Sequence, residues 1–285
     1  VQGLDLGLPG DAGYAGMRVL YALNDTDRMD EVVSFLGASY FRLLGPGQAY
    51  GLSARGIALD VAGSGPEEFP AFEAFWVVRP EPGGDHLRIV ALLDGPSLTG
   101  AYAFVLRPGE PAPAADGSNG EVAAAGAEVQ GRKRPTVLEV DARLFARRDV
   151  RRLGVAPLTS MYLHGSLEPA ADDVRPRVHD SEGLLMLTSG EEWIWRPLTN
   201  RPRLRITSLQ DTDPPGFGLA QRTRAFSDYL DLEARYHSRP SLWVDVDGRW
   251  GTGGVELVEI PTNSEFFDNV VAYFAPDEPF EAGDT

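Results

Sequence analysis

A carboxylate and two indole rings share one polar stretch of this chain, the segment RPRVHDSEGLLMLTSGEEWIWRP at 175–197. Asp180 lies beside a polar turn, and Trp193 and Trp195 stand one residue apart. Because side chains alternate between the two faces of a β-strand, the two indoles are predicted to share one face. Flat apolar rings next to carboxylates suit a sugar, since the rings stack on its C–H faces and the acids accept hydrogen bonds from its hydroxyls. The segment therefore predicts a carbohydrate site.

The charge of the chain narrows the class of ligand. Lys and Arg number 26 against 42 Asp and Glu, which gives a net charge of −16. Such a field repels a phosphate backbone, so we expect no nucleic-acid partner. An uncharged, hydroxyl-rich ligand is neither attracted nor repelled by this net charge.

Neither a metal nor a cofactor is expected. The sequence has no cysteine, and its four histidines, His86, His164, His179 and His237, are isolated from one another. The G-x-S-x-G elbow, the P-loop and the H-E-x-x-H motif are all absent from the sequence. His179 is adjacent to Asp180 and could orient it, although a histidine satisfied within a loop is the commoner case. Carboxylates remain as candidate catalysts, and glycoside hydrolysis needs only two of them.

Short strands must position these residues. Runs of β-branched and aromatic residues recur about every ten residues between turn residues, as in MRVLYAL from Met17, LRIVALLD from Leu87 and NVVAYFAP from Asn269. This spacing predicts a large antiparallel β-sandwich. Short helices are predicted at 27–37, 66–74 and 227–236. The segment 110–135 is rich in Ala, Gly and Pro and is interpreted as a flexible surface insertion.

Several longer segments of the sequence point to a family. DEVVSFLGASYFR, YGLSARG, LGVAPLTSM, RVHDSEG, PSLW and VELVEIPTN closely resemble the periplasmic glucan biosynthesis proteins G and D, and the resemblance runs from Gly16 to Pro276. It implies an all-β fold, a galactose-mutarotase-like supersandwich with a few short helices, and a periplasmic location. It also implies β-1,2-linked glucan as the ligand, with the membrane glucan synthase machinery as a second candidate partner. Residues 1–285 are then expected to form most of one glucan-handling domain, without the further N-terminal strands and C-terminal immunoglobulin-like domain usual in the family.

The resemblance also implies a catalytic pair. Some members are similar to inverting endo-β-1,2-glucanases, whose general acid precedes an N-I-V-A strand and whose base lies in an H-D-S segment. Matched residue by residue, the acid is Asp268 and the base is Asp180. The alternative for both is a turn-forming aspartate with no catalytic role. The family often has a small polar stretch before Asp268, where this chain has Glu265, Phe266 and Phe267, and the added apolar surface would favour a protonated acid.

Other residues are assigned to substrate binding. The segment QRTRAFSDYLDLEARY at 221–236 carries five polar or aromatic candidates, which are Arg222, Arg224, Tyr229, Glu233 and Tyr236. Guanidinium and carboxylate groups can make paired hydrogen bonds to vicinal sugar hydroxyls. Tyrosine offers both an aromatic ring and a hydroxyl. The resemblance adds Tyr40, Tyr50 and Arg55, and the tryptophan pair Trp193 and Trp195 is included. The structural alternative for the segment 221–236 is that its charged residues form ion pairs that fix an irregular stretch of chain. The structural alternative for the tryptophans is that they belong to the core.

Three functions are compatible with these residues. The first is inverting endo-hydrolysis of β-1,2-glucan or a related transglycosylation. The second is non-catalytic glucan binding or a scaffold role in synthesis of the glucan backbone. The third is a mutarotase-like activity on monosaccharides, disfavoured because such enzymes usually employ histidines. The oligomeric state stays open.

Overall fold

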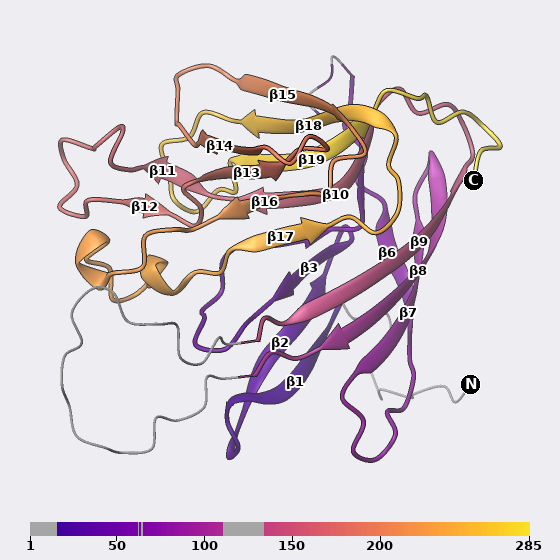
Figure 1. Ribbon diagram of the computed structural model, residues 1–285, viewed down its shortest axis with the longest axis horizontal. Helices are drawn as coiled ribbons and strands as arrows, with labels where there is room; N and C mark the ends of the chain where they lie inside the picture. Colours follow the sequence, from indigo (N-terminus) through magenta and orange to yellow (C-terminus); the bar gives the residue numbers. More distant parts are fainter. Residues whose placement is uncertain (1–15, 62, 64, 111–133) are drawn as a thin grey trace, which may run out of the picture.

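The computed structural model describes residues 16–61, 63, 65–110 and 134–285. Antiparallel strands make up nearly all of its regular structure, and the described residues contain no α-helix (Figure 1). Two single-turn 3₁₀ helices, η1 (Phe226–Asp228) and η2 (Tyr236–Ser238), interrupt the strands. The prediction of an all-β fold of antiparallel sheets is confirmed.

A nine-stranded sheet is the largest element, in the order β1-β2-β3-β4-β10-β19-β18-β15, with β5 paired to β10. Its strands are β1 (Gly16–Asp25), β2 (Arg28–Leu36), β3 (Tyr40–Leu43), β4 (Ser53–Arg55), β5 (Ile57–Leu59), β10 (Leu153–Ser160), β15 (Arg205–Thr212), β18 (Thr252–Glu259) and β19 (Val270–Pro276).

Two four-stranded sheets face it. One has the order β6-β7-β8-β9 and the other β14-β13-β16-β17, and a separate ribbon pairs β11 with β12. The first comprises β6 (Ala71–Val77), β7 (Leu87–Asp94), β8 (Leu98–Arg107) and β9 (Val137–Ala146). The second comprises β14 (Trp193–Pro197), β13 (Gly183–Leu187), β16 (Gly216–Ala220) and β17 (Leu242–Asp245). The ribbon is β11 (Tyr162–His164) and β12 (Val178–His179).

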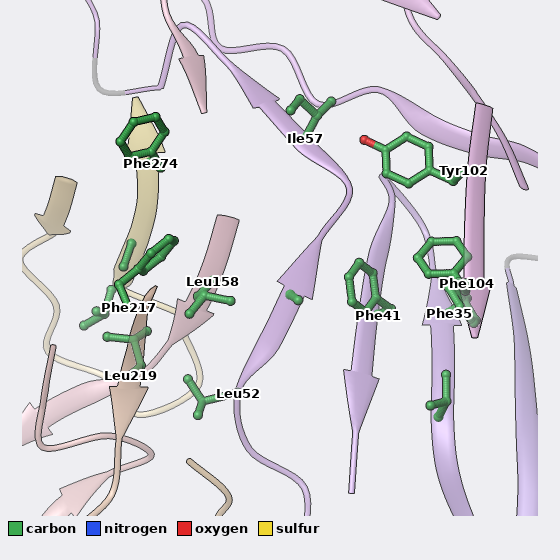
Figure 2. Packing of buried hydrophobic residues seen from close by; sticks show 14 of the residues in the cluster. Phe35, Phe41, Leu52, Ile57, Tyr102, Phe104, Leu158, Phe217, Leu219 and Phe274 are labelled. Carbon is green, nitrogen blue, oxygen red and sulfur yellow. The ribbon is translucent and has the colours of Figure 1, made fainter. Parts of the chain in front are cut away.

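One hydrophobic core joins all three sheets (Figure 2). Phe104 of β8 packs against Phe35 of β2 with ring centroids 5.1 Å apart, whereas Phe217 of β16 lies near Leu158 of β10 and Phe274 of β19. The nine-stranded sheet therefore has one face in the core and one face outside it. The same holds for β14-β13-β16-β17, so the outer faces of these two sheets lie on opposite sides of the sandwich.

Two of the three predicted helices are wrong. Residues 28–36 of the first form β2, which is paired on both sides by β1 and β3. Its Val32, Val33 and Phe35 are fully buried, and burial on a paired strand outweighs the local helical pattern. In the second, Pro70 favours an extended residue before it, and β6 starts at Ala71. The third survives only as η1 and the start of η2.

The predicted insertion at 110–135 lies outside the described residues except at its two ends. There Glu110 and Arg134 form an isolated antiparallel bridge, in which each backbone N–H donates to the other's carbonyl at 3.2 Å.

Candidate functional site

Asp180 follows β12 and is held close to the core. Its backbone N–H donates to the Met161 carbonyl at 2.9 Å, and the residue is only 8% exposed. Arg239 Nε lies 3.4 Å from Asp180 Oδ1, yet among the described residues this oxygen accepts no hydrogen bond. A buried carboxylate with an unsatisfied oxygen retains the capacity to accept a proton.

The electrostatics of Asp180 link it to the second predicted acid. Burial raises the pKa of Asp180 to about 6; the Arg239 guanidinium opposes this rise, the Asp268 carboxylate adds to it, and Arg42 opposes it. Asp268 therefore lies within electrostatic reach of Asp180, although the two residues are distant in the chain. A carboxyl with a pKa near 6 is matched to general-base chemistry close to neutral pH.

Asp268 itself is exposed, in the loop immediately before β19. The next residue fixes its backbone: Asn269 Oδ1 accepts from the Tyr162 N–H at 2.8 Å, and Asn269 Nδ2 donates to the carbonyls of Tyr162 and Ile260 at 3.0 and 2.9 Å. Asn269 thus ties the Asp268 loop to β11. Phe266 and Phe267 are largely exposed and add apolar surface to the same loop.

Arg175 anchors the Asp268 loop from its other end. Arg175 Nη1 donates to Glu265 Oε2 at 2.9 Å and to Asp231 Oδ2 at 2.8 Å, and Nη2 donates to Asp173 Oδ2 at 2.8 Å. The Tyr236 hydroxyl donates to the same Glu265 carboxylate. Burial alone would raise the pKa of Glu265, but the hydrogen bonds from Arg175 and Tyr236 bring it below its usual range. Glu265 is therefore an ionised anchor.

Two predicted binding residues, Tyr40 and Arg55, lie on the outer face of the nine-stranded sheet. They are paired across β3 and β4, with the guanidinium carbon of Arg55 3.8 Å from the Tyr40 ring centroid and 3.9 Å from that of Phe69. Arg42 is two residues from Tyr40 on β3, so it shares this face. Its Nε donates to Ser53 Oγ at 2.7 Å.

Tyr50 borders an open groove of about 510 Å³, which is also lined by Glu31, Gln48 and Arg235. Burial and a hydrogen bond with Glu31 raise the pKa of Tyr50 to about 12, and Arg42 acts against this rise. Arg42 influences the pKa of both Tyr50 and Asp180, although neither Asp180 nor Asp268 lines this groove. The Ala49 N–H donates to the Ser238 carbonyl at 2.9 Å and ties the groove wall to η2.

The candidates in 221–236 are placed in several different environments. Tyr229 is fully buried, and its hydroxyl donates to the Thr223 carbonyl at 3.1 Å. Tyr236 is buried against Glu265, and Arg224 donates to the Arg239 carbonyl and, at 3.0 Å, to Ser241 Oγ. Glu233 is exposed. Most of these contacts hold the segment in place, as the structural alternative supposed.

Trp193 and Trp195 do share one face, as the alternation predicted. That face is the outer side of β14-β13-β16-β17, because Leu184 and Met186 on the neighbouring strand β13 point into the core. Arg222 stacks on Trp195, with its guanidinium carbon 4.0 Å from the ring centroid. Both indoles therefore lie on the opposite side of the sandwich from Tyr40, Arg42 and Arg55, and neither lines the groove at Tyr50.

His179 does not orient Asp180. Its Nδ1 is 2.9 Å from Gln221 Oε1, and its ring stacks on Tyr162 with centroids 5.3 Å apart. Burial lowers the pKa of His179 to about 4, so it is neutral near pH 7 and serves the packing of the ribbon.

A comparison with protein families decides the relationship. The chain matches the family described as periplasmic glucan biosynthesis protein, MdoG, over residues 3–115 and 121–285. The chain belongs to the MdoG family. The resemblance inferred from the sequence is confirmed, and this periplasmic family connects the protein with glucan biosynthesis. No helix in the described part of this MdoG-family protein is long and apolar enough to cross a membrane.

Sequence reasoning missed several residues that surround the two acids in this MdoG-family protein. Arg42 could have been found, because period-two alternation places it beside Tyr40. Arg239, Arg175 and Glu265 carry no such signal. They meet Asp180 and the Asp268 loop only through folding, and Arg175 and Glu265 are 90 residues apart in the chain.

Asn269 offers a test of how firmly the Asp268 loop is held. We expect Asn269→Ala to lower the free energy of unfolding by about 2–4 kcal/mol, because it leaves buried backbone groups of Tyr162 and Ile260 unpaired. Asn269 is 2% exposed, so water does not readily replace the lost amide. Urea denaturation measures the change, with the exposed Asn263→Ala as control. Equal stability of the two variants would show that Asn269 is not the anchor.

Proposed function

We propose that the protein acts on β-1,2-linked glucan by inverting endo-hydrolysis or a related transglycosylation. The observation that supports this most is the pairing of a buried Asp180, whose pKa is about 6, with an exposed Asp268 within its electrostatic reach. Inverting glycosidases use two carboxyl groups in different environments, one to donate and one to accept a proton. Family membership supports glucan as the substrate class.

The environments suggest how the two acids divide the work. Asp268 reaches solvent and would protonate the glycosidic oxygen as the bond between that oxygen and the anomeric carbon breaks. Asp180 would take a proton from the water that attacks the anomeric carbon from the opposite face. The carboxyls of inverting enzymes stand about 6.5–9.5 Å apart to make room for this water, or farther apart if a water or sugar hydroxyl relays the proton. In a transfer reaction a sugar hydroxyl replaces the water.

Arg239 and Arg42 have a defined role in this scheme. Both guanidiniums oppose the rise in the pKa of Asp180 that burial causes. They thereby keep the base largely ionised at neutral pH, when it must accept a proton. The groove lined by Tyr50 and Glu31 would hold the flanking glucosyl units.

The proposal predicts a preference among glucans. We expect the protein to bind linear β-1,2-glucan at least about tenfold more tightly than β-1,3- or β-1,4-glucan, a difference of about 1.4 kcal/mol, and to release reducing ends from the first alone. Because the ligand is uncharged, the affinity should change little with salt. Calorimetry and a reducing-end assay on the same three polymers measure both properties. Equal affinities would refute the assignment of linkage.

A non-catalytic role in glucan synthesis, as a binding protein or as a scaffold for the membrane synthase machinery, is the second candidate. The ion pair between Arg239 and Asp180 favours it, since a structural carboxylate is often neutralised in this way. Wild-type protein that binds β-1,2-glucan and releases no reducing ends would support this role over catalysis.

A further inference from the structure

Two tryptophans lie together on the outer face of the sheet β14-β13-β16-β17. Trp193 is 58% exposed and Trp243 is 38% exposed. They belong to the two edge strands, β14 and β17, which are separated by two further strands and therefore stand about 14 Å apart. Their ring centroids are nevertheless only 5.4 Å apart, with the rings tilted by 42°. Both indoles must therefore lean inward and lie across the middle of the sheet.

Glycines beneath the rings make this arrangement possible. A Cβ on Gly216 would stand 2.5 Å from Cζ2 of Trp243, and a Cβ on Gly183 would stand 2.4 Å from Cζ2 of Trp195. Side chains at these positions would lift the indoles off the sheet. The Trp195 ring is stacked by Arg222, whereas no described residue hydrogen-bonds to the indole N–H of Trp193 or of Trp243. These two rings form an open aromatic surface.

We propose that Trp193 and Trp243, together with Asp245, form a second glucan-binding surface. Asp245 is paired with Gly216 in β16 and lies on the same side of β17 as Trp243. The indoles would stack on the C–H faces of a glucosyl unit, and the Asp245 carboxylate would accept hydrogen bonds from its hydroxyls. This inference rests on the proposed function, because it takes the same class of polymer as its ligand.

The position of this surface separates it from the groove at Tyr50. Alternate residues of β13, Leu184 and Met186, are buried in the core that the nine-stranded sheet shares, so the tryptophans lie on the outer face, and neither Trp193 nor Trp243 lines the groove at Tyr50. A chain bound at the tryptophans would therefore not occupy the groove at Tyr50. It would hold polymeric glucan on the protein while another segment of polymer occupies the groove.

A protein partner suits this surface less well than a sugar. Two indoles and one carboxylate cover far less than the roughly 1,000 Å² that a stable protein interface buries. The net charge of −16 also disfavours anionic ligands that stack on aromatic rings, such as nucleotides. A neutral pyranose ring is small enough for this surface and is not repelled by the net negative charge.

The test measures binding of linear β-1,2-glucan to the full chain by affinity electrophoresis, in an Asp180→Asn background that keeps the polymer intact. Trp193→Ala should weaken binding of the polymer about tenfold, the effect of removing one aromatic anchor. Asp245→Ala should weaken it severalfold while leaving both indoles in place. Trp76→Ala is the matched control, because Trp76 is 41% exposed on a different sheet, and it should leave binding unchanged.

The outcomes separate this inference from the proposed function. If the parent Asp180→Asn chain binds the polymer and Trp193→Ala and Asp245→Ala bind it equally well, the second surface is refuted and the proposed function is untouched. If the parent chain binds no β-1,2-glucan at all, the proposed function fails and the surface fails with it. Melting temperatures of all variants show that each is folded.

Discussion

Replacing Asp268 with Asn is expected to lower turnover of β-1,2-glucan by about 10²- to 10⁴-fold, the usual contribution of a positioned acid, with glucan binding preserved. The amide keeps the shape of the carboxyl and its ability to hydrogen-bond, but it has no proton to give to the leaving oxygen. Asp268 is exposed, so the substitution should leave the core intact. Reducing ends released by the wild type and by Asp268→Asn measure the effect, and calorimetry measures binding.

The control is Asp277→Asn, which alters another exposed acid close to the same strand, just after β19. It should retain wild-type turnover. If Asp268 only shaped its turn, the Asn substitution would change stability by about 1 kcal/mol or less and leave turnover nearly unchanged. An active wild type whose Asp268→Asn variant keeps the full rate would therefore remove Asp268 from the acid role.

The strands could be read from the sequence because their signal is local. The patterns LRIVALLD at 87–94 and NVVAYFAP at 269–276 predict strands, and these segments contain β7 and β19. The pattern at 27–37 predicts a helix, because Asp30 and Glu31 preceding an apolar run imitate the start of one, whereas the segment 28–36 forms a strand. It forms β2 only because β1 and β3 are available on both sides, and no local pattern reveals such partners.

The site could be predicted only in part, because its geometry depends on contacts between segments that are distant in the chain. Alternation placed Trp193 and Trp195 on one face, but which side of the sandwich receives that face depends on how the sheets pack. Family resemblance selects Asp180 and Asp268, which the structure places within electrostatic reach of each other; their catalytic roles stay a prediction. The residues that tune and anchor them, Arg239 and Arg175, are brought there by long-range folding and are indistinguishable in the sequence from other arginines.

Turnover should also depend on pH through Asp180. If Asp180 is the base, it must be ionised, and burial raises its pKa to about 6. The rate should then be nearly independent of this group well above pH 6 and fall about tenfold for each pH unit well below it. A pH profile of kcat/KM shows this limb directly. A limb near pH 4, the ordinary range of an aspartate, would indicate that a different, more exposed carboxyl is the base.

Arg239 provides the decisive variant for this assignment. Its guanidinium opposes the rise in the pKa of Asp180, so Arg239→Met removes a favourable partner of the ionised form and should raise that pKa further. The acid limb of the profile should then move to higher pH, and activity lost at pH 6 should return at higher pH. Arg205→Met, which changes an exposed arginine of β15, should leave the limb in place. If Arg239 were merely structural, its replacement would lower activity equally at all pH values. If Arg239 lowers the pKa of Asp180, its replacement shifts the acid limb. Melting temperatures across the same pH range distinguish this shift from unfolding.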